Sequence, residues 1–263
     1  MKFFITNLKL FFWILCVTSE GNAVSKTKKG LVLLFCSEDT HRDRIHKKTW
    51  QKSFEDHKED FEIYYVHRRC DLKAIYAIKE DSLFLKRPIE ALWQTSWGWI
   101  ESLHILQNRL EAFDYVIQAD IRSFLVVPKL KNILEKYDDP TLYLGNVLHY
   151  ENERCNGDFV DHSFCLLGKQ SAKFLANSPS FVEALGTNKY LDEEILVGAI
   201  LRKKGITPVH IPSFPLNRFV RPYKIRDRVE SATFVFPVDL KQTTKSYYHK
   251  EQILLEELFE IFT

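Results

Sequence analysis

Apolar runs and polar breaks alternate along the chain and predict strands and helices in turn. A continuous apolar run at 31–35 is typical of a parallel strand buried on both faces, because such a strand has no side that faces water. Further strands are expected at 61–66, 115–119, 141–147 and 207–211.

Helical patterns lie between these runs. Across 88–110, apolar side chains return at alternating spacings of four and three, which indicates an amphipathic helix opened by Pro88 at a first-turn position. We expect the tryptophans of this segment to pack in the core. Other helices are expected at 41–52, 130–137, 169–176, 190–204 and 251–262. This alternation predicts an α/β fold with a mostly parallel sheet and helices on both faces.

The strand at 115–119 ends at a carboxylate, Asp120. Open sheets of parallel strands bind ligands at the carboxyl ends of those strands. Asp120 is therefore a candidate site residue.

Composition narrows the classes of protein to consider. The 263 residues are 45% hydrophobic and 14% aromatic, which suits one sizeable globular core and not a disordered chain. The formal net charge of +2 gives no reason to expect nucleic-acid binding.

The N-terminus indicates the secretory pathway. Lys2 and Lys9 precede a short apolar run at 10–17, and Gly21 and Ala23 supply small residues beyond it. A helix needs about twenty apolar residues to cross a bilayer, and this run is shorter. We expect 1–23 to be a cleaved signal peptide, with a signal anchor as the alternative. In both cases 24–263 is expected to be a single domain in the lumen of the Golgi or endoplasmic reticulum.

Four cysteines follow Cys16, and they are Cys36, Cys70, Cys155 and Cys165. An oxidising lumen permits two disulfides, and Cys155–Cys165 is the preferred pair because it closes a short loop. No pair shows the spacing of a zinc site.

An ordered set of motifs resembles the core-1 β1,3-galactosyltransferase-like family. The motifs are Lys-Lys-Thr-Trp at 47–50, Leu-Trp-Gln-Thr at 92–95, Asp-Tyr-Val-Ile-Gln-Ala-Asp at 114–120, Lys-Tyr-Asp-Asp-Pro at 136–140, Tyr-Leu-Gly at 143–145, Glu-Glu-Ile-Leu-Val-Gly at 193–198 and Ser-Tyr-Tyr-His at 246–249. Each motif is short, but together they span nearly all of the chain after the N-terminal segment.

The resemblance implies a GT-A-type nucleotide-sugar-binding fold. Active relatives move galactose from UDP-galactose onto O-linked N-acetylgalactosamine with inversion, and they use manganese. The metal neutralises the diphosphate leaving group, and a carboxylate takes the proton of the acceptor hydroxyl. The resemblance assigns the base to Glu194 and substrate binding to Asp120, Arg122, Trp93 and Lys47.

The chain departs from the family at the metal motif. The three consecutive acids of the family fall on Asp120, Ile121 and Arg122, so only the first is kept. A cation in the third place repels a divalent metal, so we expect no manganese cofactor. Arg122 either neutralises the diphosphate itself or marks an inactive site. His249 lies one place beyond the late metal-ligand histidine of the family, whose place Tyr248 takes.

The base position and the acceptor side depart as well. Glu194 stands where relatives have aspartate, and misplacing a reacting group by about an ångström costs roughly a hundredfold in rate. Acids at 192–194 also suit the first turn of a helix through its dipole, which leaves a structural alternative open. A glycine-rich run of the family is replaced by bulky residues at 161–167.

Three functions therefore remain open. The first is a galactosyltransferase, acting without metal, on UDP-galactose and an O-glycan acceptor. The second is a catalytically inactive relative that acts as a chaperone or partner of another glycosyltransferase. The third is a secreted sugar-binding module that uses the same pocket.

Overall fold

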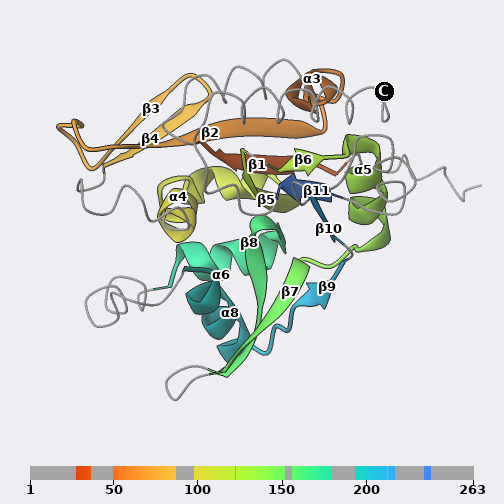
Figure 1. Ribbon diagram of the computed structural model, residues 1–263. Coiled ribbons are helices and arrows are strands. Elements are labelled where there is room, and N and C mark those ends of the chain that lie inside the picture. The colour runs from red at the N-terminus through yellow and green to blue at the C-terminus, as the bar shows by residue number, and fades with distance from the viewer. Residues whose placement is uncertain are drawn as a thin grey trace, which may run out of the picture.

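A computed structural model describes residues 28–36, 50–86, 98–121, 123–151, 156–178, 193–211, 213–216 and 234–237. Their main feature is an eight-stranded sheet (Figure 1). In spatial order its strands are β3 (Tyr76–Lys79), β4 (Ser82–Lys86), β2 (Phe61–Arg69), β1 (Gly30–Phe35), β5 (Tyr115–Asp120), β8 (Asn156–Gly168), β7 (Tyr143–Glu151) and β9 (Val209–His210). A smaller sheet contains β10 (Ser213–Leu216), β11 (Phe234–Pro237) and β6 (Phe124–Leu125).

The centre of the large sheet is parallel. β1 pairs in parallel with both β2 and β5, and β2 pairs in parallel with β4. β8 then runs antiparallel to β5 and to β7, while β9 is parallel to β7. The carboxyl ends of β1 and β5 therefore share one edge, where Phe35 lies opposite Asp120.

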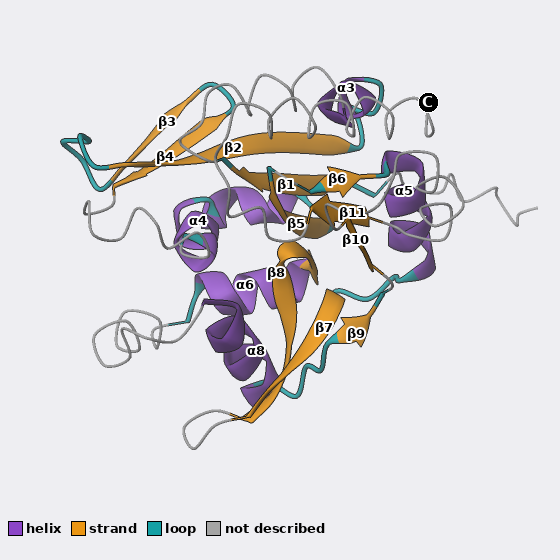
Figure 2. Ribbon diagram, in the orientation of Figure 1, coloured by secondary structure: helices purple, strands orange, loops and turns teal. Residues whose placement is uncertain are grey.

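Six helices of the described part cover the sheet. They are α3 (Trp50–Glu55), α4 (Trp99–Ile105), the 3₁₀ helix η2 (Gln107–Ala112), α5 (Val127–Lys136), α6 (Lys169–Ala176) and α8 (Glu193–Lys203). Figure 2 shows α4, α6 and α8 gathered on one side of the strands. The predicted α/β class, a mostly parallel sheet between helices, is confirmed.

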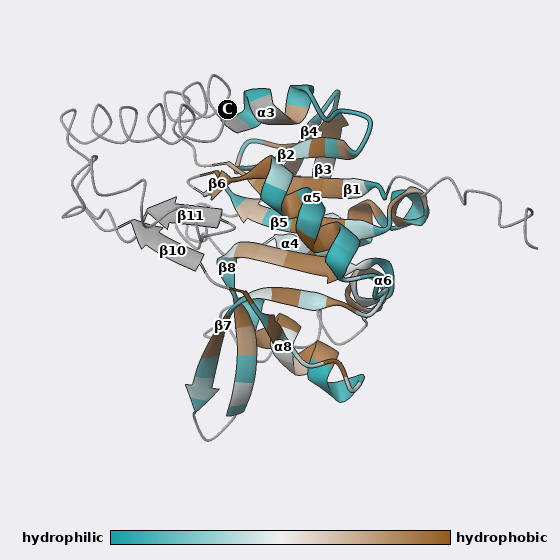
Figure 3. Cartoon of the chain, turned by 90° about the vertical axis from the view of Figure 1, so that its right-hand side faces the viewer, coloured by the Kyte–Doolittle hydropathy of each residue, from teal (hydrophilic) through white to brown (hydrophobic). Residues whose placement is uncertain are grey.

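The strand β1 divides the core between the two faces of the sheet. Val32 and Leu34 face a cluster that includes side chains of α3 and α5. Leu31 and Leu33 face a second cluster that includes side chains of α4, α6 and α8. Figure 3 shows the hydrophobic colour running along β1, which is buried at every position. The apolar run of the sequence arises from this burial on both faces.

Several predicted elements occur where the sequence placed them. Strands cover the apolar runs at 31–35, 61–66 and 115–119, and α6 has the predicted bounds 169–176. The helix predicted at 190–204 is present as α8, followed by Gly205 at φ 77°. The segments 1–23 and 251–262 lie outside the described residues, as does most of 41–52.

The helix predicted over 88–110 is not continuous in its described part. α4 ends at Ile105, and Leu106 adopts φ −92° and ψ 8° before η2 begins. Leu106, between the two helices, and Leu110, in η2, are still buried in the core, which is why the apolar spacing resembled one long helix. The tryptophan that the structure describes in this segment, Trp99, is 2% exposed and packs in the core as expected.

The predicted disulfide between Cys155 and Cys165 is wrong. Cys165 is a buried free thiol in the middle of β8, opposite Gln118 of β5. Cys155 lies outside the described residues but adjoins Asn156, the first residue of β8. Asn156 and Cys165 are nine positions apart along β8, roughly 30 Å at 3.3 Å per residue of extended strand, whereas the two Cα atoms of a disulfide lie about 6 Å apart.

No helix within the described residues is long and apolar enough to cross a lipid bilayer.

Candidate functional site

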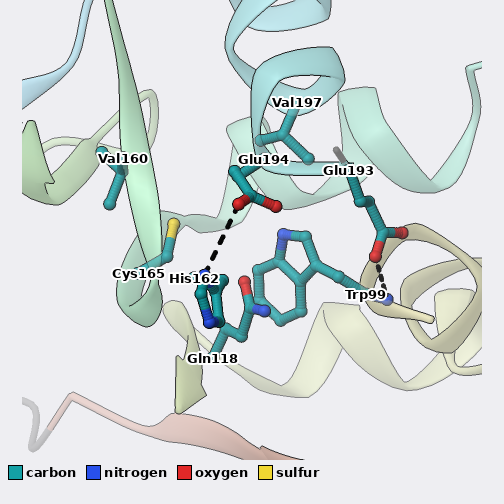
Figure 4. A pocket seen from close by; sticks show the side chains of 8 residues that line it. All are labelled: Trp99, Gln118, Val160, His162, Cys165, Glu193, Glu194 and Val197. Atoms are coloured by element: carbon teal, nitrogen blue, oxygen red, sulfur yellow. Dashed lines mark hydrogen bonds and ion pairs between the residues drawn. The ribbon is translucent and has the colours of Figure 1, made fainter. Parts of the chain in front are cut away.

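A small cavity lies where α4 and α8 meet β5 and β8. Figure 4 shows its lining side chains, which come from all four elements. They are Trp99, Gln118, Val160, His162, Cys165, Glu193, Glu194 and Val197. The cavity leaves about 10 Å³ for the centres of water molecules, which is room for about one water.

An irregularity in β8 brings His162 to this cavity. Val160 pairs with Val147 and Cys165 with Gly145, so four residues of β8 lie opposite one residue of β7. The carboxylate of Asp161 accepts the backbone N–H of Ser163 at 2.8 Å and also its hydroxyl. Bulges of this kind turn a side chain out of the strand pattern, and they are common beside active sites.

His162 forms an ion pair with Glu194, the first-turn residue of α8. Their Nδ1 and Oε1 atoms are 3.5 Å apart, too far for a strong hydrogen bond. Asp161 Oδ2 lies 3.8 Å from the same nitrogen. Burial lowers the pKa of His162, but the carboxylates of Glu194, Asp161 and Asp120 raise it to about 9. The imidazole is therefore protonated at neutral pH and carries a positive charge among three acids.

Glu193, the neighbour of Glu194, has a structural role. Glu193 is 3% exposed, and its carboxylate accepts the backbone N–H groups of Gly98 at 2.8 Å, Trp99 at 3.0 Å and Ile100 at 2.9 Å. These donors open α4 and have no partner inside that helix. Successive residues of a helix point about 100° apart, so Glu193 reaches α4 while Glu194 turns to the cavity. Glu193 stands in the first turn of α8, as the structural alternative expected, and its carboxylate caps α4 as well.

Three buried polar atoms of the cavity have no hydrogen-bond partner among the described residues. They are Trp99 Nε1, His162 Nδ1 and Glu194 Oε2. Figure 4 shows the indole nitrogen of Trp99 turned toward the Glu194 carboxylate. Buried polar atoms are rarely left unsatisfied, because each costs about 1–3 kcal/mol. Their convergence on one small cavity indicates that a polar group completes the site.

Asp120 ends β5 on the same side, and its charge acts on His162. The two acids that the sequence assigned to the site, Asp120 and Glu194, therefore both act on the charge of His162. The residue after Asp120 does not suit a metal: Ile121 is 1% exposed, and its N–H donates to Phe35 O at 3.0 Å. No group of three or more potential ligands that could hold a metal occurs among the described residues.

The other predicted site residues, Lys47, Trp93, Arg122, Cys155 and His249, lie outside the described residues.

Sequence reasoning missed three cavity residues. His162 belongs to the run 161–167, whose sequence shows only that bulky residues replace the glycines of the family. Trp99 was predicted to pack in the core. Its ring does so, but its N–H also lines the cavity, which the prediction did not include. Gln118 offered a signal, since a polar side chain inside the apolar run of β5 stays only 7% exposed.

Comparisons with known proteins find structural similarity only. No family model matches the chain, and no curated protein matches it in sequence. Among solved structures, it is similar to a glycosyltransferase involved in the glycosylation of the major capsid of PBCV-1, with a TM-score of 0.49 and 13% identity over 87% of this chain and 98% of that one. It is also similar to the glycosyltransferase GlyE of Streptococcus pneumoniae TIGR4.

The GlyE apo-form has a TM-score of 0.44 and 11% identity, and a second GlyE structure has 0.43 and 9%. Each match covers 89% of this chain and 64% of GlyE. These neighbours are glycosyltransferases. Similarity this low does not establish a shared activity, so function has to be inferred from the chain's own residues.

Proposed function

We propose that this chain is a GT-A-type glycosyltransferase that transfers galactose from UDP-galactose to O-linked N-acetylgalactosamine in β1,3 linkage, without a metal cofactor. The observation that carries the proposal is the meeting of Asp120, from the end of β5, and Glu194, from the start of α8, around one protonated histidine. The motif resemblance assigns these two positions to the donor side and to the base.

Glu194 is the proposed catalytic base. As the acceptor oxygen forms its bond to the anomeric carbon, the bond from that carbon to the diphosphate oxygen breaks. The electron pair leaves with the diphosphate, and the acceptor proton passes to Glu194. The partly buried carboxylate has one unpartnered oxygen, Oε2, available for that proton.

Positive charge for the diphosphate comes from side chains in this proposal. The charge of His162 lies within the electrostatic reach of Asp120, and Arg122 follows two residues after Asp120. A guanidinium makes bidentate contacts with phosphate. By its place in the sequence, Arg122 belongs to the motif that the resemblance gives to the nucleotide.

The test is transfer by the purified chain from UDP-galactose to benzyl α-N-acetylgalactosaminide, with manganese and with EDTA. We expect equal product in both, loss of at least a hundredfold in Glu194→Gln, and full activity in the control Glu135→Gln, on the exposed side of α5. Activity that requires manganese contradicts the metal-free proposal. Undiminished activity of Glu194→Gln contradicts the role of the base.

A second candidate is an inactive relative that binds and protects another glycosyltransferase. The ion pair favours it, because a carboxylate already held by an imidazolium is a weaker base. In that case the purified chain makes no product but suppresses aggregation of a heat-treated core-1 galactosyltransferase. The expected location for both candidates is the lumen of the secretory pathway, which protease protection of the expressed chain in microsomes tests.

A further inference from the structure

The unpartnered atoms of the cavity form a set with a definite chemistry. Trp99 Nε1 is a donor only, and Glu194 Oε2 accepts as a carboxylate oxygen. His162 Nδ1 is a donor because its ring is protonated at neutral pH. The cavity therefore presents two donors and one acceptor, in a space for about one oxygen atom.

An alcohol oxygen matches this set. Its two lone pairs accept two hydrogen bonds, and its single O–H donates one. A water molecule fits the space but has a second O–H, for which the unpartnered lining atoms supply no further acceptor. An ammonium group has no lone pair for the donors, and a carboxylate or phosphate would meet the negative charge of Glu194.

The exposed fractions of the three side chains indicate from which side a ligand group can enter the cavity. Trp99 is 2% exposed, while the side chains of Glu194 and His162 are 14% and 29% exposed. The indole therefore forms the closed end, and the opening lies beside His162. A sugar hydroxyl that entered from the side of His162 would end against the indole N–H.

We infer that Trp99, His162 and Glu194 together form the seat of a single substrate hydroxyl, with the Trp99 N–H as a binding residue at its closed end. The inference rests on the proposed function, which makes that hydroxyl O3 of an N-acetylgalactosamine acceptor. It adds two residues to that function. Trp99 and His162 hold the oxygen of the acceptor hydroxyl by hydrogen bonds, while Glu194 faces the hydroxyl proton. It also explains why a bulge in β8 places a histidine at this edge of the sheet.

The test measures binding without donor, so it does not depend on turnover. The probes are benzyl α-N-acetylgalactosaminide and its 3-deoxy and 4-deoxy analogues. The indole ¹H–¹⁵N signal of Trp99, assigned by its loss in Trp99→Phe, is followed during each titration. We expect the parent and the 4-deoxy sugar to shift this signal, and the 3-deoxy sugar to leave it in place and to bind at least about tenfold more weakly.

Variants separate the hydrogen bond from packing. Trp99→Phe removes the N–H and should weaken the parent sugar about tenfold while changing the 3-deoxy sugar little. Leu103→Val is the control, because it trims the same buried cluster on α4 and removes no polar atom. Thermal unfolding of both variants confirms that they are folded.

The outcomes distinguish the two ideas. If the acceptor is galactosylated but the Trp99 signal stays fixed and the 3-deoxy sugar binds equally well, the hydroxyl seat is wrong and the proposed function stands. If neither the parent nor any analogue binds, the seat and the proposed function are both overturned.

Discussion

His162 and Glu194 face each other across the cavity, with 3.5 Å between Nδ1 and Oε1. One lies in the bulge of β8 and the other in the first turn of α8, so the pair ties the sheet to a helix. Both side chains retain an unpartnered atom. The ion pair therefore fixes the two charges and still leaves a donor and an acceptor that can bind a ligand.

The titration of His162 is the first prediction. Its pKa is raised from 6.5 to about 9 in the folded chain. Between these values the unfolded chain has lost the proton and the folded chain still holds it, so stability falls as pH rises. The contribution of His162 is complete below pH 6.5, amounts to about 2–3 kcal/mol there, and is lost through pH 9.

Chemical denaturation of the wild type and of His162→Gln at pH 6 and pH 9.5 measures this effect. The difference in free energy of unfolding between the two proteins should shrink by about 2–3 kcal/mol at the higher pH. An NMR titration of the ring supplies the pKa directly. A midpoint near 6.5 would show that the three acids do not hold the proton.

The second prediction concerns the carboxylate that caps α4. Glu193→Gln keeps the shape but turns an NH₂ group toward backbone donors and removes the charge. We expect a loss of about 2–3 kcal/mol in the free energy of unfolding, since three buried N–H groups depend on this side chain. The exposed control Glu135→Gln should change stability by less than about 0.5 kcal/mol. Similar values for both variants would contradict the capping role.

The two central strands β1 and β5 were predictable because burial on both faces leaves a mark in the sequence. β1 and β5 are apolar runs, since every side chain of β1 meets one of two clusters. β8 carries no such mark. Its first part does not pair with β5, mixes exposed, half-buried and buried positions without regular alternation, and contains Asp158, Asp161 and His162. The local pattern of apolar and polar residues therefore does not predict a strand.

The site was predictable only at the positions that a motif marks. Asp120 and Glu194 were found through their neighbours in sequence, but His162 joins them through a bulge whose register depends on β5 and β7. The disulfide prediction failed for a related reason. A separation of ten residues is short in a loop and long in an extended strand, and nothing local tells the two apart.

Thiol chemistry supplies the third prediction. Cys165 is buried and burial raises its pKa, whereas Cys70 is exposed. Under native conditions iodoacetamide should label Cys70 within minutes and leave Cys165 unmodified until the chain unfolds. Peptide mass mapping reads both sites in one sample, so Cys70 serves as the internal control. A Cys155–Cys165 cross-linked peptide in the unreduced map would restore the disulfide.

The last prediction tests the bulge through Gly145, the residue of β7 opposite Cys165. A Cβ there would lie 2.2 Å from Val160 Cγ1 and 2.6 Å from the Phe164 carbonyl oxygen. The valine can rotate, but the carbonyl belongs to the backbone of the bulge and has to shift. We expect Gly145→Ala to cost about 3 kcal/mol of unfolding free energy, in the range of overpacked cores.

Gly205→Ala is the matched control, because its Cβ would meet nothing within 4 Å and only its φ of 77° opposes the change. We expect that variant to lose about 1 kcal/mol. If the bulge positions His162, Gly145→Ala should also bring the pKa of His162 back toward 6.5 by moving the ring away from Glu194, and Gly205→Ala should not. Equal losses of stability with an unchanged titration of His162 would mean that the bulge does not set the geometry of the site.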